Sequence, residues 1–161
     1  MDSFVNLYGL NRFGKGVDVK KAQKDFFDVF NSCLKIHPLR SISKDSIDSL
    51  YESVLFELKE KTMRVEKSFA SKLLHSIYPN QIPIIDNNVL QKLRIPRYYG
   101  SVENAKKTLI KLSEWYEKYI KTSDAIECIK FFDKEFPDFK KISSYKKIDF
   151  FLWQSVKLNK V

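Results

Sequence analysis

The sequence has few of the residues that interrupt helices or make tight turns. Of its 161 residues only four are glycine and five are proline, which is too few for the repeated turns of most all-β folds, for a collagen-like repeat or for a long linker. Its two cysteines have no histidine partners at the spacing of a metal site. No apolar run approaches the roughly 18 residues that a membrane span needs. Metal-binding, disulfide-stapled and membrane-spanning proteins are therefore not indicated.

What the sequence does contain indicates one folded helical domain. Apolar residues make up 43% and aromatic residues 14% of the chain, a composition that disfavours disorder, and the length suits a single domain, which we expect over residues 1–161. Cys33 and Cys128 each fall at an apolar position of a helical pattern, so we expect reduced thiols in a core. The start, Met1-Asp2-Ser3, lacks the basic and apolar regions of a signal peptide, and we expect a cytoplasmic protein.

Apolar residues recur at spacings of three and four along most of the chain, which predicts an all-α fold of about seven helices. A turn is expected at residues 11–16. The expected helices cover residues 17–37, 43–58, 68–78, 86–93, 101–119, 122–136 and 143–156. Serine, threonine or aspartate stands at most of the expected helix starts, as in N-caps. Between the third and fourth helices, residues 79–86 hold two prolines four apart, Pro79 and Pro83, and three isoleucines, which predicts an extended, buried connector over residues 81–86.

The net charge of +9 is unevenly distributed. Residues 1–86 carry 13 basic and 11 acidic side chains, or +2; residues 87–113 carry +5, residues 114–139 carry −3 and residues 140–161 carry +5. If the fold joins the two +5 stretches, they form a basic face suited to a phosphate backbone. The alternative is that lysine merely solvates the helices, because the chain has 24 lysines and only five arginines.

Lys72 and Asp86 are the residues that favour catalysis. Lys72 stands in the first turns of an apolar helix and Asp86 at the start of the next, with the stiff connector between them. Burial of a lysine disfavours its ammonium form, and the neutral amine is the form that attacks a sugar C1′ to give a Schiff base. An aspartate beside it stabilises positive charge on a deoxyribose ring as a base departs. The pair therefore suits a glycosylase or lyase step.

The same residues resemble a known family. The stretch from Lys72 to Pro83-Ile84-Ile85-Asp86 resembles the helix-hairpin-helix DNA glycosylases of the 8-oxoguanine glycosylase-like fold, in which a helix bearing the Schiff-base lysine precedes a Pro-x-Asp loop whose aspartate is catalytic and caps the next helix. The resemblance implies that Lys72 and Asp86 take these two roles. It covers residues 62–95, and residues 146–154 resemble the ending of small uncharacterised bacterial proteins of such a fold. In place of the family's glycine-rich hairpin, residues 65–71 contain no glycine.

Further residues are candidates for DNA contact. A loop holds Arg94 and the basic-aromatic run Arg97, Tyr98 and Tyr99, of a kind that stacks on a base or wedges a duplex. On the last expected helix, Lys146 and Lys147 belong to the second +5 stretch, and Gln154 could read a base edge if the helix faces a pocket. Phe150, Phe151 and Trp153 on that helix are expected in the core.

Structural roles remain open for the same residues. Asp86 could be only an N-cap, Lys72 could extend from a helix edge into solvent, His75 is expected to be packed or hydrogen-bonded, and the two tyrosines could cover a core edge. We therefore predict a DNA-binding protein resembling a base-excision glycosylase/AP lyase, with no metal or other cofactor and with DNA as its partner. The alternatives are a non-catalytic DNA-binding module and a protein-interaction module that docks through the acidic stretch 114–139.

Overall fold

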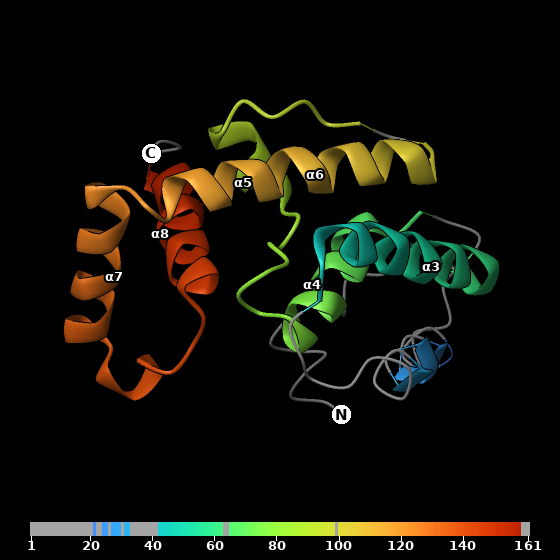
Figure 1. Cartoon of the computed structure of the whole chain (residues 1–161), viewed down its shortest axis with the longest axis horizontal. Coiled ribbons are helices and arrows are strands. Elements are labelled where there is room, and N and C mark those ends of the chain that lie inside the picture. Colours follow the sequence, from blue (N-terminus) through green and yellow to red (C-terminus); the bar gives the residue numbers. More distant parts are fainter. Residues whose placement is uncertain are drawn as a thin grey trace.

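The computed structural model describes residues 21, 24–25, 27–29, 31–32, 42–62, 65–98 and 100–158. Within them every regular element is helical and no strand occurs. From residue 44 onward the elements, shown in Figure 1, are α3 (Lys44–Thr62), α4 (Lys67–Ile77), α5 (Asn87–Lys92), α6 (Val102–Tyr119), α7 (Ser123–Glu135), the 3₁₀-helix η1 (Pro137–Phe139) and α8 (Ser144–Leu158). The all-α prediction is confirmed.

The first expected helix is described only in part. The described residues between 21 and 32 are helical, and Lys21 forms an ion pair with Asp25 one turn later, at 2.8 Å. The expected turn at residues 11–16, Cys33 and Tyr99 lie outside the described residues.

Most of the other helices begin where a side chain caps them. At each of these starts a hydroxyl oxygen accepts a hydrogen bond, 3.1 to 3.3 Å long, from the backbone N–H three residues later. Such a cap satisfies one of the N–H groups that a helix start leaves without an internal partner. The capping residues are Ser43 for α3, Ser101 for α6, Thr122 for α7 and Ser143 for α8. Local sequence therefore fixes where these helices start, as predicted.

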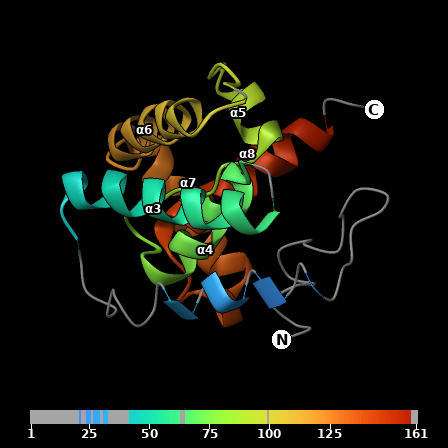
Figure 2. The same cartoon turned by 90° about the vertical axis from the view of Figure 1, so that its right-hand side faces the viewer.

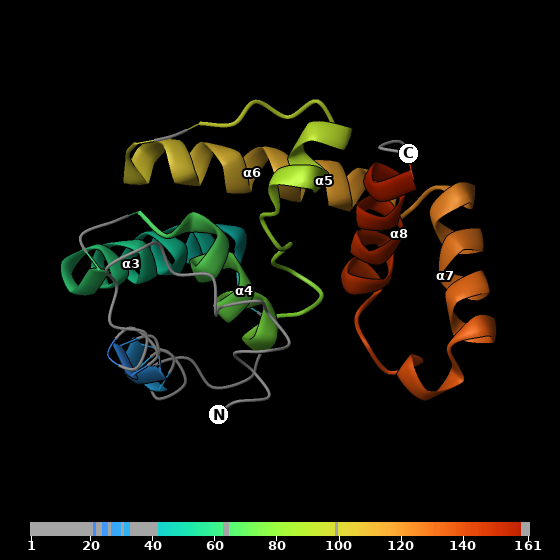
Figure 3. The ribbon, with the colours of Figure 1, turned by 180° about the vertical axis from the view of Figure 1, so that it is seen from behind.

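The helices form two groups that α6 joins. The helix α3 packs against α4 and α6, while α8 packs against α5 and α7. In Figure 1, α6 extends from above α3 across to α7 and α8, and Figure 2 shows α3 lying between α6 and α4. The connector between α4 and α5 passes between the two groups, as the view from behind in Figure 3 also shows.

One core runs through both groups. Fully buried aliphatic side chains come from α3, α4, the connector, α5, α6 and α8, and include Leu55, Leu73, Ile82, Leu90, Leu109 and Ile148. Burial of each such side chain stabilises the fold by about 1.5–3 kcal/mol. In the connector, Ile82, Pro83, Ile84 and Ile85 are all buried and no residue is helical, so the predicted extended, buried connector is confirmed.

The aromatic residues of α8 are a correction to the predicted core. Phe150, Phe151 and Trp153 are half-buried rather than buried, because α7, which packs on this part of α8, is itself open to solvent on its other side. Phe150 and Phe151 make ring contacts with three phenylalanines of the α7 region, with centroid separations of 5.5 to 6.1 Å, namely Phe131, Phe132 and Phe136. Phe131 remains 54% exposed. Cys128 of α7, also expected in the core, is half-buried against it.

Two properties of the described residues bear on function. None of their helices combines the length and the apolar character that crossing a bilayer demands. In the same part of the chain, His, Cys, Asp and Glu side chains do not gather in groups of three or more that could hold a metal ion.

Candidate functional site

The connector folds back along α4, and two hydrogen bonds hold it there. His75 Nδ1 lies 2.7 Å from the Ile82 carbonyl oxygen, and the Ile85 backbone N–H donates to Ser71 Oγ at 2.8 Å. Ser71 and His75 are four residues apart and therefore share one face of α4. Because the bonds join His75 to Ile82 and Ser71 to Ile85, the connector runs antiparallel to the helix. It returns the chain to the first turns of α4.

This return brings Asp86 next to Lys72. The Ser71–Ile85 hydrogen bond joins the two residues that directly precede Lys72 and Asp86 in the chain, so it brings Lys72 and Asp86 into the same region of the fold. Both residues are half-buried. Burial lowers the pKa of Lys72, the negative charges of Asp86 and Asp149 oppose this shift, and the positive charge of Lys146 adds to it. The two predicted catalytic residues therefore belong to one electrostatic cluster.

Asp86 is also the N-cap of α5. Its Oδ1 accepts the backbone N–H groups of Asn88 at 2.7 Å and Val89 at 3.4 Å. These bonds fix the orientation of the carboxylate, and α5 is too short to form without such support. The cap role that the sequence left open is present, and it holds the carboxylate beside Lys72.

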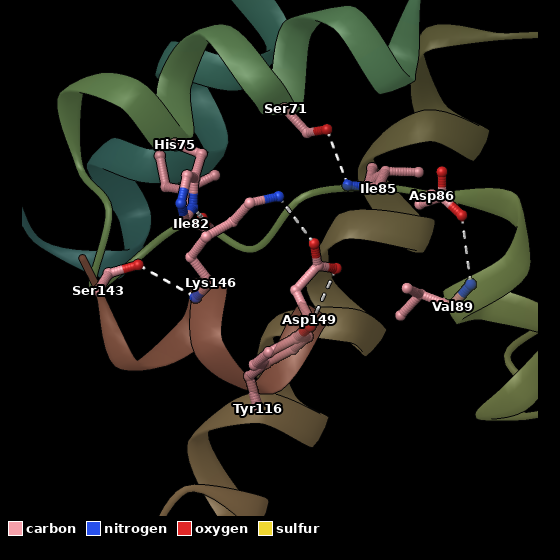
Figure 4. Close-up of polar contacts among 10 residues, drawn as sticks. All are labelled: Ser71, His75, Ile82, Ile85, Asp86, Val89, Tyr116, Ser143, Lys146 and Asp149. Carbon is pink, nitrogen blue, oxygen red and sulfur yellow. Dashed lines mark hydrogen bonds and ion pairs between the residues drawn. The ribbon is translucent and has the colours of Figure 1, made fainter. Parts of the chain in front are cut away.

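Figure 4 shows a second carboxylate at this place, on α8. Asp149 is buried, with 8% of its surface exposed. Its Oδ2 accepts a hydrogen bond from Lys146 Nζ at 3.0 Å, and its Oδ1 accepts a long one, 3.5 Å, from the Tyr116 hydroxyl of α6. Burial raises the pKa of Asp149, while the positive charge of Lys146 opposes the rise. Burial also raises the pKa of Tyr116 well above its usual value, with Asp149 adding to the rise.

His75 has a structural role in this cluster. A carbonyl oxygen can only accept, so Nδ1 of His75 carries the proton and donates to Ile82. Burial lowers the pKa of His75 to about 4, which leaves the ring neutral at physiological pH. The expectation of a packed, hydrogen-bonded histidine is confirmed.

The predicted DNA-contact residues of the loop lie beside α5. Arg94 and Arg97 are exposed and Tyr98 is half-buried. Arg97 Nη2 donates to the Asn87 carbonyl oxygen and to Gln91 Oε1, both at 3.1 Å, so its guanidinium is anchored one residue from Asp86. The Tyr98 hydroxyl accepts from Lys111 Nζ at 2.8 Å and its carbonyl oxygen from Lys67 Nζ at 2.7 Å. Tyr98 thus joins two lysines, from α4 and α6.

The predicted DNA-contact residues of α8 divide between the site and the interior. Lys146, with 39% of its side chain exposed, is in the cluster through Asp149. Lys147 is only 4% exposed, and its Nζ lies 2.6 Å from Asp133 Oδ1 of α7 and donates to the Lys140 carbonyl oxygen. Its expected place on a basic face is thereby corrected, because the ion pair with Asp133 holds the side chain where α7 packs on α8. Gln154 is half-buried near the end of α8.

Ser71, Tyr116 and Asp149 are site residues that were not among the candidates predicted from the sequence. A signal for Asp149 was present, because it is the only acidic residue of the last 22 and shares the spacing of Tyr145, Ile148 and Leu152. A lone carboxylate on the apolar face of a helix has to be buried with partners. Its partner Tyr116 is 33 residues away in the sequence, and no pattern of neighbouring residues predicts a contact over that separation.

Comparisons of the chain with models of protein families, with curated proteins and with solved structures find no match.

Proposed function

We propose that this chain binds DNA and acts at abasic or damaged deoxynucleotides as a glycosylase/AP lyase of the base-excision type. One observation carries the proposal: Lys72 is half-buried, and burial lowers its pKa. Beside it is Asp86, whose carboxylate is held in place by the N-terminus of a helix. A lysine in that setting supplies the free amine that a Schiff base requires. Perturbed titratable groups that converge from different helices are typical of active sites.

The reaction uses groups that this site provides. In the first step, departure of a base breaks the bond between the base nitrogen and C1′, and the Asp86 carboxylate stabilises the positive charge that develops on the sugar. Water then adds to C1′, and the resulting abasic sugar opens to an aldehyde. In the second step, the Lys72 amine forms a bond to C1′ and the aldehyde oxygen leaves as water, which gives a Schiff base. Loss of a proton from C2′ then breaks the bond between C3′ and its oxygen, and the phosphate leaves with the electron pair.

Exposed cations next to the site support the DNA partner. Lys92, Arg94 and Arg97 are exposed on α5 and the loop after it. These three cations are defined here as the α5 cation group. Arg97 is the best placed of them, because its bond to Asn87 holds it beside Asp86 and a planar guanidinium suits bidentate contact to phosphate. Phosphate contacts of this kind position a nucleic acid without reading its sequence.

The test is covalent trapping on DNA that contains an abasic site. Sodium borohydride reduces a Schiff base to a stable amine, so the wild-type protein is expected to give a cross-linked protein–DNA band. Lys72→Gln should lose the band, because an amide does not attack an aldehyde. The matched control is Lys67→Gln, five residues earlier on the same helix, which should retain the band because the Lys67 amine is bonded to the Tyr98 carbonyl oxygen. If wild type gives no adduct on abasic or 8-oxoguanine DNA, the lyase proposal is wrong.

The α5 cation group favours a second candidate, a DNA-binding module without chemistry. These exposed cations can bind a phosphate backbone whether or not Lys72 reacts. In that case wild type and Lys72→Gln retard duplex DNA equally, with an affinity that falls steeply with salt. Substitution of Arg97 by Gln would weaken binding, and no variant would give an adduct.

A further inference from the structure

Asp149 is a buried carboxylate that the proposed reaction has not yet used. Its partners come from two helices: Lys146 one turn earlier on α8 and Tyr116 on α6. Replacing a buried ion pair by apolar side chains is often neutral or stabilising, so such a pair is weak evidence of a purely structural role. In Figure 4 its carboxylate lies between the Lys146 side chain and the part of the site that holds Asp86.

The two carboxylates of the site have different surroundings. Asp86 is half-buried and accepts two backbone N–H groups that cannot move away. These bonds hold the carboxylate in a fixed orientation, which suits a residue that stabilises positive charge. Asp149 is buried and accepts from two side chains, one of them at 3.5 Å, and burial raises its pKa. In active sites with two carboxylates in such different environments, one commonly stays charged and stabilises positive charge, while the other transfers protons.

We propose that Asp149 is the proton carrier of the Schiff-base step, taking a proton from the Lys72 ammonium and returning it to the hydroxyl group that leaves C1′ as water. The inference rests on the proposed function and assigns a further catalytic residue to the same site.

The protons balance through one cycle. Transfer from the Lys72 ammonium to Asp149 leaves a neutral amine, whose lone pair forms the bond to C1′ of the aldehyde. One of the two remaining protons on nitrogen passes to the former carbonyl oxygen and gives a hydroxyl group. Asp149 then donates its proton to that hydroxyl, the bond from carbon to oxygen breaks and water leaves. The product is the protonated Schiff base, with Asp149 again ionised.

The charged and titratable groups around Asp149 suit this exchange. Lys146 of α8 and Tyr116 of α6 contact it, and the charges of Asp86 in the connector and Lys72 on α4 interact with it. Burial disfavours both the Lys72 ammonium and the Asp149 carboxylate, so passing a proton from one to the other removes two charges that burial disfavours. The Lys146 ammonium opposes protonation of Asp149, so the proton is held weakly enough to be returned.

The test compares the rate of adduct formation in wild type and Asp149→Asn on abasic DNA at pH 5 and pH 7.5. The variant should be slower by about 100-fold at pH 7.5, a typical contribution of general acid–base catalysis, and by less than about tenfold at pH 5, where acid from solvent replaces the missing group. Asp149 raises the pKa of Lys72, so its removal leaves more free amine. A slower rate in the variant would therefore come from the loss of proton transfer and not from a shortage of the free Lys72 amine.

Asp133→Asn is the matched control, since Asp133 also pairs with a lysine of α8, Lys147. It should trap at the wild-type rate at both pH values. Equal rates for wild type and Asp149→Asn would overturn the proton-carrier inference and leave the lyase standing. A deficit of the same size at both pH values would also overturn it, because a purely structural defect has no reason to shrink in acid. Absence of any wild-type adduct would overturn the proposed function, and the inference with it.

Discussion

Asp86 combines a structural and a chemical role, and single substitutions can separate them. As the N-cap of α5 it needs an oxygen that accepts two backbone N–H groups, which asparagine also offers. As the group that stabilises positive charge beside Lys72 it needs a carboxylate. The two roles therefore make different demands on the same side chain.

We predict that Asp86→Asn keeps stability within about 0.5 kcal/mol of wild type, whereas Asp86→Ala loses roughly 1 kcal/mol with the cap. Both variants should form the borohydride adduct about 100-fold more slowly, because both lack the negative charge. Chemical denaturation measures the first effect and trapping on abasic DNA the second. Full trapping by Asp86→Asn would mean that the residue is only a cap.

At the scale of elements, the site depends on the connector lying along α4. Ser71 Oγ has two bonds at this junction, accepting from the Ile85 N–H at 2.8 Å and donating to the Ser68 carbonyl oxygen at 2.9 Å. The residue is fully buried, so no water can replace the hydroxyl group without rearrangement. The pairing of α4 with the connector thus depends on one small side chain.

Ser71→Ala should destabilise the fold by about 1–3 kcal/mol, because it leaves the buried N–H of Ile85 without an acceptor. It should also slow trapping, since the Ser71–Ile85 bond sets Asp86 beside Lys72. The control is Ser76→Ala on the same helix, whose hydroxyl only donates to the Leu73 carbonyl oxygen, and which should change stability by less than about 0.5 kcal/mol. Equal stability losses in the two variants would contradict this account of the junction.

The helices were predicted well, because their starts depend on residues close together in the sequence. Contacts between residues far apart in the sequence were not predicted. Ser101 and Thr122 cap the helices that they were expected to cap, because capping involves residues three apart. The return of the connector depends on bonds that span 7 and 14 residues, which spacing alone does not reveal. The aromatic residues of α8 have the spacing of core residues. Their burial, however, depends on how much of α7 is covered by other helices.

At the scale of the whole molecule, the basic side chains of the described residues do not form one uniform basic face. Several lysines of the two +5 stretches are engaged within the fold: Lys106 with Glu52, Lys146 with Asp149 and Lys147 with Asp133. The α5 cation group remains exposed beside Asp86. Packing of α5 on α8 brings parts of the two stretches together, which was the condition set for a shared basic face. The cations nearest the site, however, come mainly from the first stretch.

The central claim is that the Lys72 amine reacts with the deoxyribose. Its most direct test is to digest the borohydride-reduced adduct of wild-type protein and abasic DNA and to locate the modified lysine by mass spectrometry. The account predicts one modified peptide, with the sugar remnant on Lys72. Modification of another lysine, such as Lys146, or the absence of an adduct would contradict it.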